Sequence, residues 1–227
     1  MSFTYGFVCQ TMHKKLPKRA PKTRADSMAE TRAALLDAAA SLFAEQGLDV
    51  PSLDAICARA GKTRGAFYVH FVDRDELVAE VMERSAPALL DALLGREDEA
   101  MGIDDVVVRV ARALATGDYP LLRAGGIMPH QIVDAAVRSP RVRARYVEVM
   151  EQAQRRLEAL LSRAISEGRV RPDCDPSGLS SLLLAAMVGT KTLVELRVPL
   201  DLPRAAGAAM ALMAITGRKG ARSSRAS

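Results

Sequence analysis

The sequence predicts an all-α protein of about nine helices. Its 227 residues contain no tryptophan, and aromatic residues make up only 4% of the chain. Alanine, leucine and arginine are abundant, and these residues are strong helix formers, whereas residues that favour strands are sparse. Apolar residues recur at helical spacing in segments that end at glycine or proline, so each segment is expected to be one helix.

The first helix is expected to begin at Ser27. Ser27 and Glu30 have the spacing of a capping box, in which a hydroxyl and a carboxylate three residues later satisfy free N–H groups. An apolar stripe follows and stops at Gly47, a residue type that often ends helices. The stripe consists of Leu35, Leu36, Ala39, Leu42 and Phe43. Residues 1–26, with several lysines and prolines, are expected to form a flexible basic arm.

Three more helices follow at short intervals. Ser52 can cap a short helix that Gly61 ends, and Thr63 can cap another of barely two turns. Asp73 and Glu76 form a second capping box, from which a longer helix should run to about residue 94. Residues 27–72 are therefore predicted to form a three-helix domain, and residues 73–94 a helix that connects it to the rest of the chain.

A larger helical domain is predicted to extend over residues 73–217. Beyond the connecting helix, its expected helices are 103–116, 120–138, 140–168, 176–197 and 202–217. Gly117 and several prolines mark the breaks between them. Residues 218–227 are expected to form a basic, disordered tail.

Charge is unevenly distributed along the chain. Residues 1–25 carry six Lys or Arg and no acid, and residues 204–227 carry five more and no acid. Because the net charge is +5, residues 26–203 carry −6. Basic tails are most often just solvated ends, but they also suit a polyanion such as DNA.

A cytoplasmic protein without membrane contact is expected. The N-terminus lacks the charged and apolar regions of a secretory signal, and the longest apolar run, residues 179–196, contains Lys191 and Glu195. Three widely separated cysteines form no disulfide framework and fit a reducing cytosol.

The stretch GKTRGAFYVHF, residues 61–71, predicts a helix that reads DNA. Two short helices joined by a tight glycine turn have the spacing of a helix-turn-helix motif, whose second helix enters the major groove. Two turns are enough to contact a few base pairs. Such a short helix is not stable alone, but Phe67 and Phe71 can hold its inner face against the neighbouring helices.

Residue types along this segment suit separate contacts with DNA. Arg64 can bond a guanine in bidentate fashion, and Val69 suits a thymine methyl group. Gly65 and Ala66 have little side chain, so the backbone can approach the base edges closely. Phosphate oxygens suit the donors of Thr63, Tyr68 and His70 and the backbone N–H groups that follow Ser52 and Thr63.

The run from Thr31 to Leu77 resembles the DNA-binding domain of the tetracycline-repressor (TetR) family of bacterial transcriptional regulators. The resemblance lies in TRAALLDAAASLFAEQG, SLDAICARAGKTRGAFYVHF and DRDEL, in that order. It implies that Thr63, Tyr68 and His70 contact phosphates and that Arg74 bonds the DNA backbone. It also implies that bases are read at Arg64, Gly65, Ala66 and Val69.

Two positions depart from the family pattern. Lys62 occupies a turn position that is usually aliphatic, where it can add a phosphate contact. Asp54 stands where many relatives carry a basic or neutral residue, so it is expected either to face away from DNA or to act by repulsion.

The last two predicted helices carry surplus apolar surface. Helix 176–197 is apolar on nearly all sides, and helix 202–217 is rich in small residues. Such surface fits either an all-α core or a four-helix seam between two chains. The family resemblance, which here includes the phrase EGRVRPDCDP, implies an effector-binding domain that dimerises through these helices.

A pocket for a small-molecule effector is also expected in the larger domain. Methionines with a few polar groups can line such a pocket, although methionines at helical spacing more often belong to a core. The candidates are Met101, Tyr119, Met128, His130, Gln131, Tyr146, Met150 and Met187. No metal or cofactor is predicted, since His130 and Asp134, one helical turn apart, do not alone make a site. Cys174 lies between two aspartates, whose charge disfavours a reactive thiolate.

The sequence therefore predicts a homodimeric, ligand-responsive repressor of a palindromic operator. It shows no ordered catalytic triad, metal cluster or glycine-rich phosphate loop that would favour an enzyme. Three alternatives stay open: a helical enzyme or binding module, a nonspecific DNA-compacting protein, and an activator in place of a repressor. Met12 and Met28 are alternative translation starts, and a start at Met28 would delete the basic arm.

Overall fold

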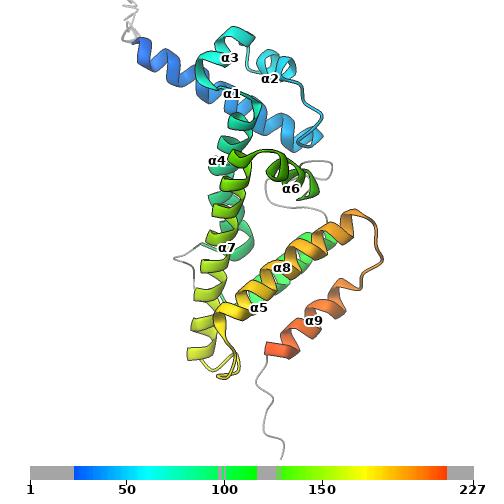
Figure 1. Cartoon of the computed structure of the whole chain (residues 1–227). Helices are drawn as coiled ribbons and strands as arrows, with labels where there is room; N and C mark the ends of the chain where they lie inside the picture. The colour runs from blue at the N-terminus through cyan, green and yellow to red at the C-terminus, as the bar shows by residue number, and fades with distance from the viewer. Residues whose placement is uncertain (1–22, 97–98, 100, 117–126, 128, 214–227) are drawn as a thin grey trace, which may run out of the picture.

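The computed structural model of the chain describes residues 23–96, 99, 101–116, 127 and 129–213. Within these residues the chain forms nine α-helices and no strand, which confirms the predicted fold class (Figure 1). The helices are α1 (Arg24–Gln46), α2 (Leu53–Arg59), α3 (Arg64–His70), α4 (Arg74–Leu94), α5 (Ile103–Thr116), α6 (Pro129–Arg138), α7 (Pro140–Ser166), α8 (Pro176–Glu195) and α9 (Leu202–Met213).

Helix α1 begins one turn earlier than Ser27. Thr23 is the N-cap: its hydroxyl oxygen accepts a hydrogen bond from the Asp26 N–H at 3.1 Å, and the Asp26 carboxylate accepts one from the Thr23 N–H at 3.0 Å. This pair is a capping box with the spacing that Ser27 and Glu30 also have, and the earlier box caps the helix. The first turns of α1 are exposed and project beyond α2 and α3, which with α1 form the head of the molecule (Figure 1).

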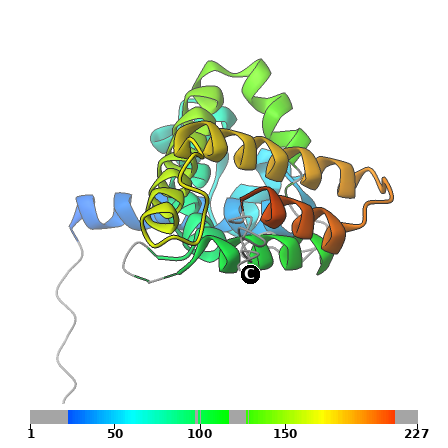
Figure 2. The ribbon, with the colours of Figure 1, turned by 90° about the horizontal axis from the view of Figure 1, so that it is seen from below.

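The long helices α4 and α7 pack against each other and form the axis of the molecule. The three short helices α1–α3 sit at one end of this axis, while α5, α8 and α9 extend to one side of it at the other end (Figures 1 and 2). Helix α9 packs mainly on α5, and α8 packs mainly on α7. This arrangement holds α3 far from the last two helices.

Two hydrophobic clusters divide the interior. The first contains the buried residues of α1–α3, the first half of α4, Ala136 of α6 and Val142 at the start of α7. The second contains the end of α4, α5, the later part of α7 and Met213 of α9. We refer to them below as the head cluster and the body cluster.

The helix ranges expected in the larger domain differ from the structure mainly at their ends. Helix α5 has the predicted range of 103–116, and α7 begins at Pro140 as predicted. Helix α6 begins at Pro129, whereas residues 120–126 and 128 of the predicted helix 120–138 lie outside the described residues. Helix α8 ends at Glu195, and α9 is described as far as Met213.

Candidate functional site

A glycine turn and a threonine cap fix where α3 begins. Gly61 has φ +64°, a left-handed conformation that glycine adopts without steric strain, and the Lys62 N–H then bonds the Cys57 carbonyl at 2.9 Å. The Thr63 hydroxyl oxygen accepts from the Ala66 N–H at 3.2 Å. Its own proton can still be donated, for example to a phosphate oxygen.

The inner face of α3 is held by two phenylalanines. Phe67 is 0% exposed and Phe71 is 1% exposed, and their rings stack with centroids 5.2 Å apart. This burial explains how a helix of seven residues is stable, and it confirms the packing expected from the sequence. Cys57 of α2 is buried in the same cluster, and its burial raises the pKa of its thiol.

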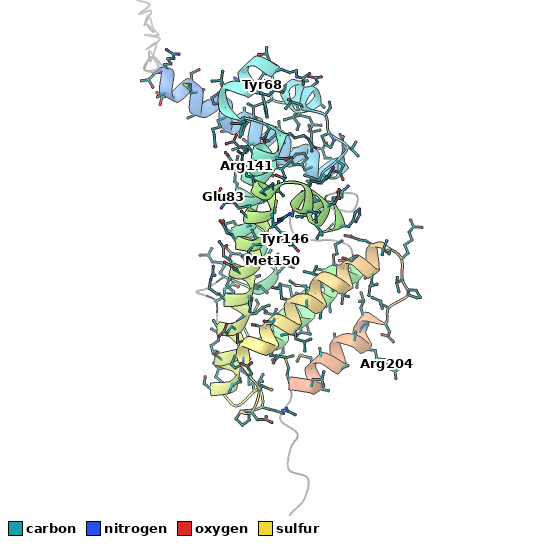
Figure 3. All side chains as sticks on the ribbon, in the orientation of Figure 1. Tyr68, Glu83, Arg141, Tyr146, Met150 and Arg204 are labelled. Carbon is teal, nitrogen blue, oxygen red and sulfur yellow. The ribbon has the colours of Figure 1, made fainter. Side chains whose placement is uncertain are left out.

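The outer face of α3 presents the expected DNA-contacting residues to solvent. Tyr68 is 55% exposed and Val69 is 66% exposed, and Figure 3 shows Tyr68 at the end of the molecule remote from α9. The other expected contacts lie on α3 or in the turn before it. Thr63, Arg64 and Gly65 are exposed, and Lys62, Ala66 and His70 are half-buried. Ser52 is exposed and caps α2.

Asp54 of α2 forms an ion pair with Arg64 of α3. The Arg64 Nε lies 3.4 Å from the Asp54 Oδ1, and more than half of each side chain is exposed. This ion pair joins α2 to α3 and was not expected from the sequence, which left open whether Asp54 faces away from DNA or repels it. Asp54 lies where it can direct the Arg64 guanidinium.

Arg74, which the family resemblance places on the DNA backbone, bonds two carbonyl groups of its own chain. Its Nη2 donates to the Leu48 carbonyl at 2.5 Å and to the Pro51 carbonyl at 3.2 Å, and the guanidinium lies over the Phe43 ring. Burial lowers the pKa of this guanidinium. Arg74 thus ties the start of α4 to the α1–α2 connection, and nothing in the residues around Arg74 indicates these distant acceptors.

We expect Arg74→Ala to destabilise the head by about 2–3 kcal/mol, because two buried carbonyls lose a charged donor. Urea unfolding of the full chain would measure this loss. Arg84→Ala is the control: Arg84 is on the same helix, more than half exposed and paired only at the surface with Asp37, so its loss should cost under about 1 kcal/mol. Weaker DNA binding with unchanged unfolding would instead support a phosphate contact.

Helix α6 lies between the head and the body. The Gln131 Oε1 accepts a hydrogen bond from the Leu48 N–H at 3.0 Å, and the Arg138 Nη2 lies 3.7 Å from the Asp49 Oδ1. At the other end of α6, the His130 Nδ1 lies 3.8 Å from the Glu195 Oε2 of α8. Gln131 and His130, expected in a ligand pocket, thus connect α6 to the head and to α8 respectively.

An apolar cavity of about 180 Å³ lies between α5, α8 and α9. It is lined by Leu94, Ile103, Val106, Val107, Val110, Ala111, Leu114, Leu157, Leu183, Ala186, Met187, Thr190, Leu202, Ala205, Ala206 and Ala209. We call it the effector cavity. Of the eight residues expected in a pocket, Met187 is the one that lines it among those the structure describes.

The remaining pocket candidates lie elsewhere. Met101 is buried in the body cluster, and Tyr146 packs against the head cluster, where burial raises the pKa of its phenol. Met150 is half-buried one turn further along α7 (Figure 3). Tyr119 and Met128 lie outside the described residues. In the part of the chain that the structure covers, no three His, Cys, Asp or Glu side chains are grouped as metal ligands.

Helices α8 and α9 expose large apolar side chains. Leu182 and Leu193 of α8 are 60% and 40% exposed, and Leu212 of α9 is 70% exposed. Among the described helices, α8 is the one long and apolar enough to cross a membrane by length and composition. Its two charged residues pair with each other, with the Lys191 Nζ 2.7 Å from the Glu195 Oε1.

Comparisons with known proteins match both parts of the chain. Residues 35–81 match the family model for bacterial regulatory proteins of the tetR family, and residues 102–210 match the model of a tetracyclin repressor-like C-terminal domain. The HTH-type transcriptional repressor KstR2 of Mycobacterium tuberculosis is 31% identical over 152 residues, which cover 63% of this chain and 71% of KstR2.

Two further relatives match different shares of the chain. The HTH-type transcriptional regulator AcrR of Shigella flexneri is 46% identical over 66 residues, 29% of this chain and 30% of AcrR, so that match spans less than a third of either protein. The structure of a SmeT–triclosan complex superimposes with a TM-score of 0.59 at 25% identity and covers 82% of this chain and 93% of that one.

Proposed function

The chain belongs to the TetR family of bacterial regulatory proteins, and on that premise we propose that it is a dimeric repressor that binds a palindromic operator and is released by a small molecule. The observation that carries this proposal is the two-sided character of α3. Phe67 of α3 and Phe71 directly after it are buried, while Tyr68 and Val69 between them are exposed. Because its target is chromosomal DNA, the protein would act in the cytoplasm.

The residues at the start and on the outer face of α3 would recognise the base pairs of the operator. Arg64 would bond a guanine, Val69 would contact a thymine methyl group, and the backbone at Gly65 and Ala66 would pass close to the base edges. Phosphate contacts come from the side chains around this face, namely Ser52, Lys62, Thr63, Tyr68 and His70. Arg74 is left out of this set, because its Nη2 bonds the Leu48 and Pro51 carbonyls within the chain.

Asp54 acts in this scheme as a positioning residue for Arg64. A carboxylate at 3.4 Å restricts the guanidinium, so that fewer conformations are lost when it binds a base. We expect Arg64→Ala to weaken operator binding by about 1–3 kcal/mol and to relax preference at one base pair. Asp54→Asn should relax preference at the same base pair.

Binding titrations of the two single variants and the double variant against operator variants test this role. The double variant should bind no worse than Arg64→Ala, because Asp54 works through Arg64. If the Asp54→Asn variant binds every DNA sequence more tightly by the same factor, Asp54 only repels phosphates. If Arg64→Ala leaves the preference among operator variants unchanged, Arg64 does not contact a base.

The exposed apolar surface of α8 and α9 would form the dimer seam. Two helices from each chain make a four-helix bundle, which covers Leu182, Leu193 and Leu212. The two heads would then enter successive major grooves about 34 Å apart. An apolar helix such as α8 thus finds its second partner in another copy of the chain.

A ligand in the effector cavity would touch the helices of this seam. Half of the lining residues belong to α8 and α9, and none of them belongs to the head cluster. A molecule that fits one arrangement of α8 and α9 better than another would shift the spacing of the two heads. A differential affinity of about 1–3 kcal/mol lowers operator affinity by roughly 5–150-fold.

Selection of DNA from random duplexes with the purified full chain tests the proposed function. A palindromic consensus with half-sites one helical turn apart is the expected result. Binding without enrichment, together with a steep salt dependence, would favour the nonspecific DNA-compacting alternative. No retained DNA at any salt concentration would favour a helical enzyme or binding module.

A further inference from the structure

The effector cavity exists because small side chains line it. Five of its sixteen lining residues are alanines, and they come from three helices: Ala111 from α5, Ala186 from α8, and Ala205, Ala206 and Ala209 from α9. The larger lining residues, such as Ile103 and Leu157, are buried in the body cluster and hold the helices apart. Two of the lining alanines, Ala186 of α8 and Ala205 of α9, are exposed, so the space of about 180 Å³ is open to solvent on that side and a ligand can enter it.

The lining disfavours a charged group that is held against it. Fifteen of the sixteen residues have apolar side chains, and the sixteenth is Thr190. A carboxylate or ammonium group in such surroundings would lose its hydration without gaining a partner, which is strongly unfavourable. The charged residues of α8, Lys191 and Glu195, bond each other and do not line the cavity.

The volume indicates the size of the ligand. An apolar cavity of about 150 Å³ in another protein stays dry and binds benzene. The effector cavity is slightly larger, so one aromatic ring with one or two added carbon atoms fits it. Thr190 is the one lining residue with a side-chain hydroxyl, which can bond a single hydroxyl group on such a ligand.

We propose that the effector cavity binds a neutral, apolar molecule of the size of a single substituted aromatic ring. The location and chemistry of this site are inferred from the residues that line the cavity. The effect of a bound ligand on DNA binding rests on the proposed function. The site disfavours carboxylate analogues of the same shape. A ligand there contacts α5, α8 and α9 and so acts on the helices of the proposed dimer seam.

Calorimetric titration of the DNA-free full chain with toluene, benzyl alcohol and benzoate tests the proposal. Toluene and benzyl alcohol should bind with one site per chain, and benzoate should bind at least about tenfold more weakly. Thr190→Val should weaken benzyl alcohol by about 2–10-fold and leave toluene unchanged, since it removes one hydrogen bond. Equal affinities for benzoate and toluene would overturn the proposal.

Variants that fill the cavity locate the site. Ala111→Leu should weaken toluene binding by at least about tenfold, because the added carbons occupy the space of the ring. Ala115→Leu is the matched control: it makes the same change on the same helix, but Ala115 is exposed and does not line the cavity. Ala206→Leu fills the opposite wall and serves as a second test if Ala111→Leu fails to fold. Undiminished toluene binding in a folded cavity-filling variant would overturn the assignment.

Operator release, measured separately with the same compounds, tests the regulatory consequence. Toluene that binds the cavity and lowers operator affinity supports both proposals. Toluene that binds without affecting DNA supports the cavity chemistry and contradicts the effector role. Absence of toluene binding in a protein that recognises its operator overturns the cavity proposal and leaves the DNA-binding function standing.

Discussion

Phe67→Ala is expected to unfold the DNA-binding end of the protein and leave the rest folded. The Phe67 side chain is fully buried and stacks on Phe71, so its removal should cost about 3–5 kcal/mol. A loss of this size is a large part of the stability of a domain. The body cluster shares no residue with the head cluster, so helices packed only in the body cluster should keep their structure.

Hydrogen exchange along the chain would measure this separation. Amide protection should fall in α1–α3 and persist in α5 and α9. Val69→Ala is the control, because Val69 is two residues away on the same helix and 66% exposed, so protection should be unchanged. Simultaneous loss of protection in head and body would show that the two clusters unfold as one unit.

Leu182→Glu is expected to separate the dimer. Leu182 is 60% exposed in the single chain, and the proposed seam covers it, so a glutamate there would place a charge in an apolar interface. Sedimentation should show a monomer at concentrations where the unaltered protein is a dimer. Operator affinity should fall by about 10²–10⁴-fold, because one head alone loses the advantage of bivalent binding.

Val108→Glu controls for the added charge. Val108 is on α5, is 64% exposed and lies outside the two helices of the proposed seam. This variant should remain dimeric and bind its operator normally. A Leu182→Glu variant that stays dimeric would place the dimer interface on another surface.

Local sequence patterns predict the helices well because the residues within one turn of each end determine where a helix begins and stops. The range of α5 and the starts of α7 and α8 follow from prolines, caps and apolar spacing within a few residues. The start of α1 differs from the prediction because two consecutive stretches, 23–26 and 27–30, have capping-box spacing, and the helix is capped by the first. The outward position of Tyr68 and the inward position of Phe67 follow from one helical period.

Contacts between distant segments could not be predicted in this way. Arg74 bonds carbonyls more than 20 residues away, and Gln131 bonds Leu48 across 83 residues. Most of the residues that the sequence suggested for a pocket do not line the effector cavity, for a different reason. The cavity is formed by alanines, whose small size is a common property of helices, and the methionines and polar residues that suggested a pocket mostly pack elsewhere.

Footprinting on the selected operator tests recognition by α3 most directly. The full chain should protect two stretches on one face of the duplex, about one helical turn apart, and each stretch should depend on the base pair at which Arg64→Ala relaxes preference. Protection that spreads along any sequence, or two stretches that Arg64→Ala leaves with their full base preference, would contradict reading of the operator by the exposed face of α3.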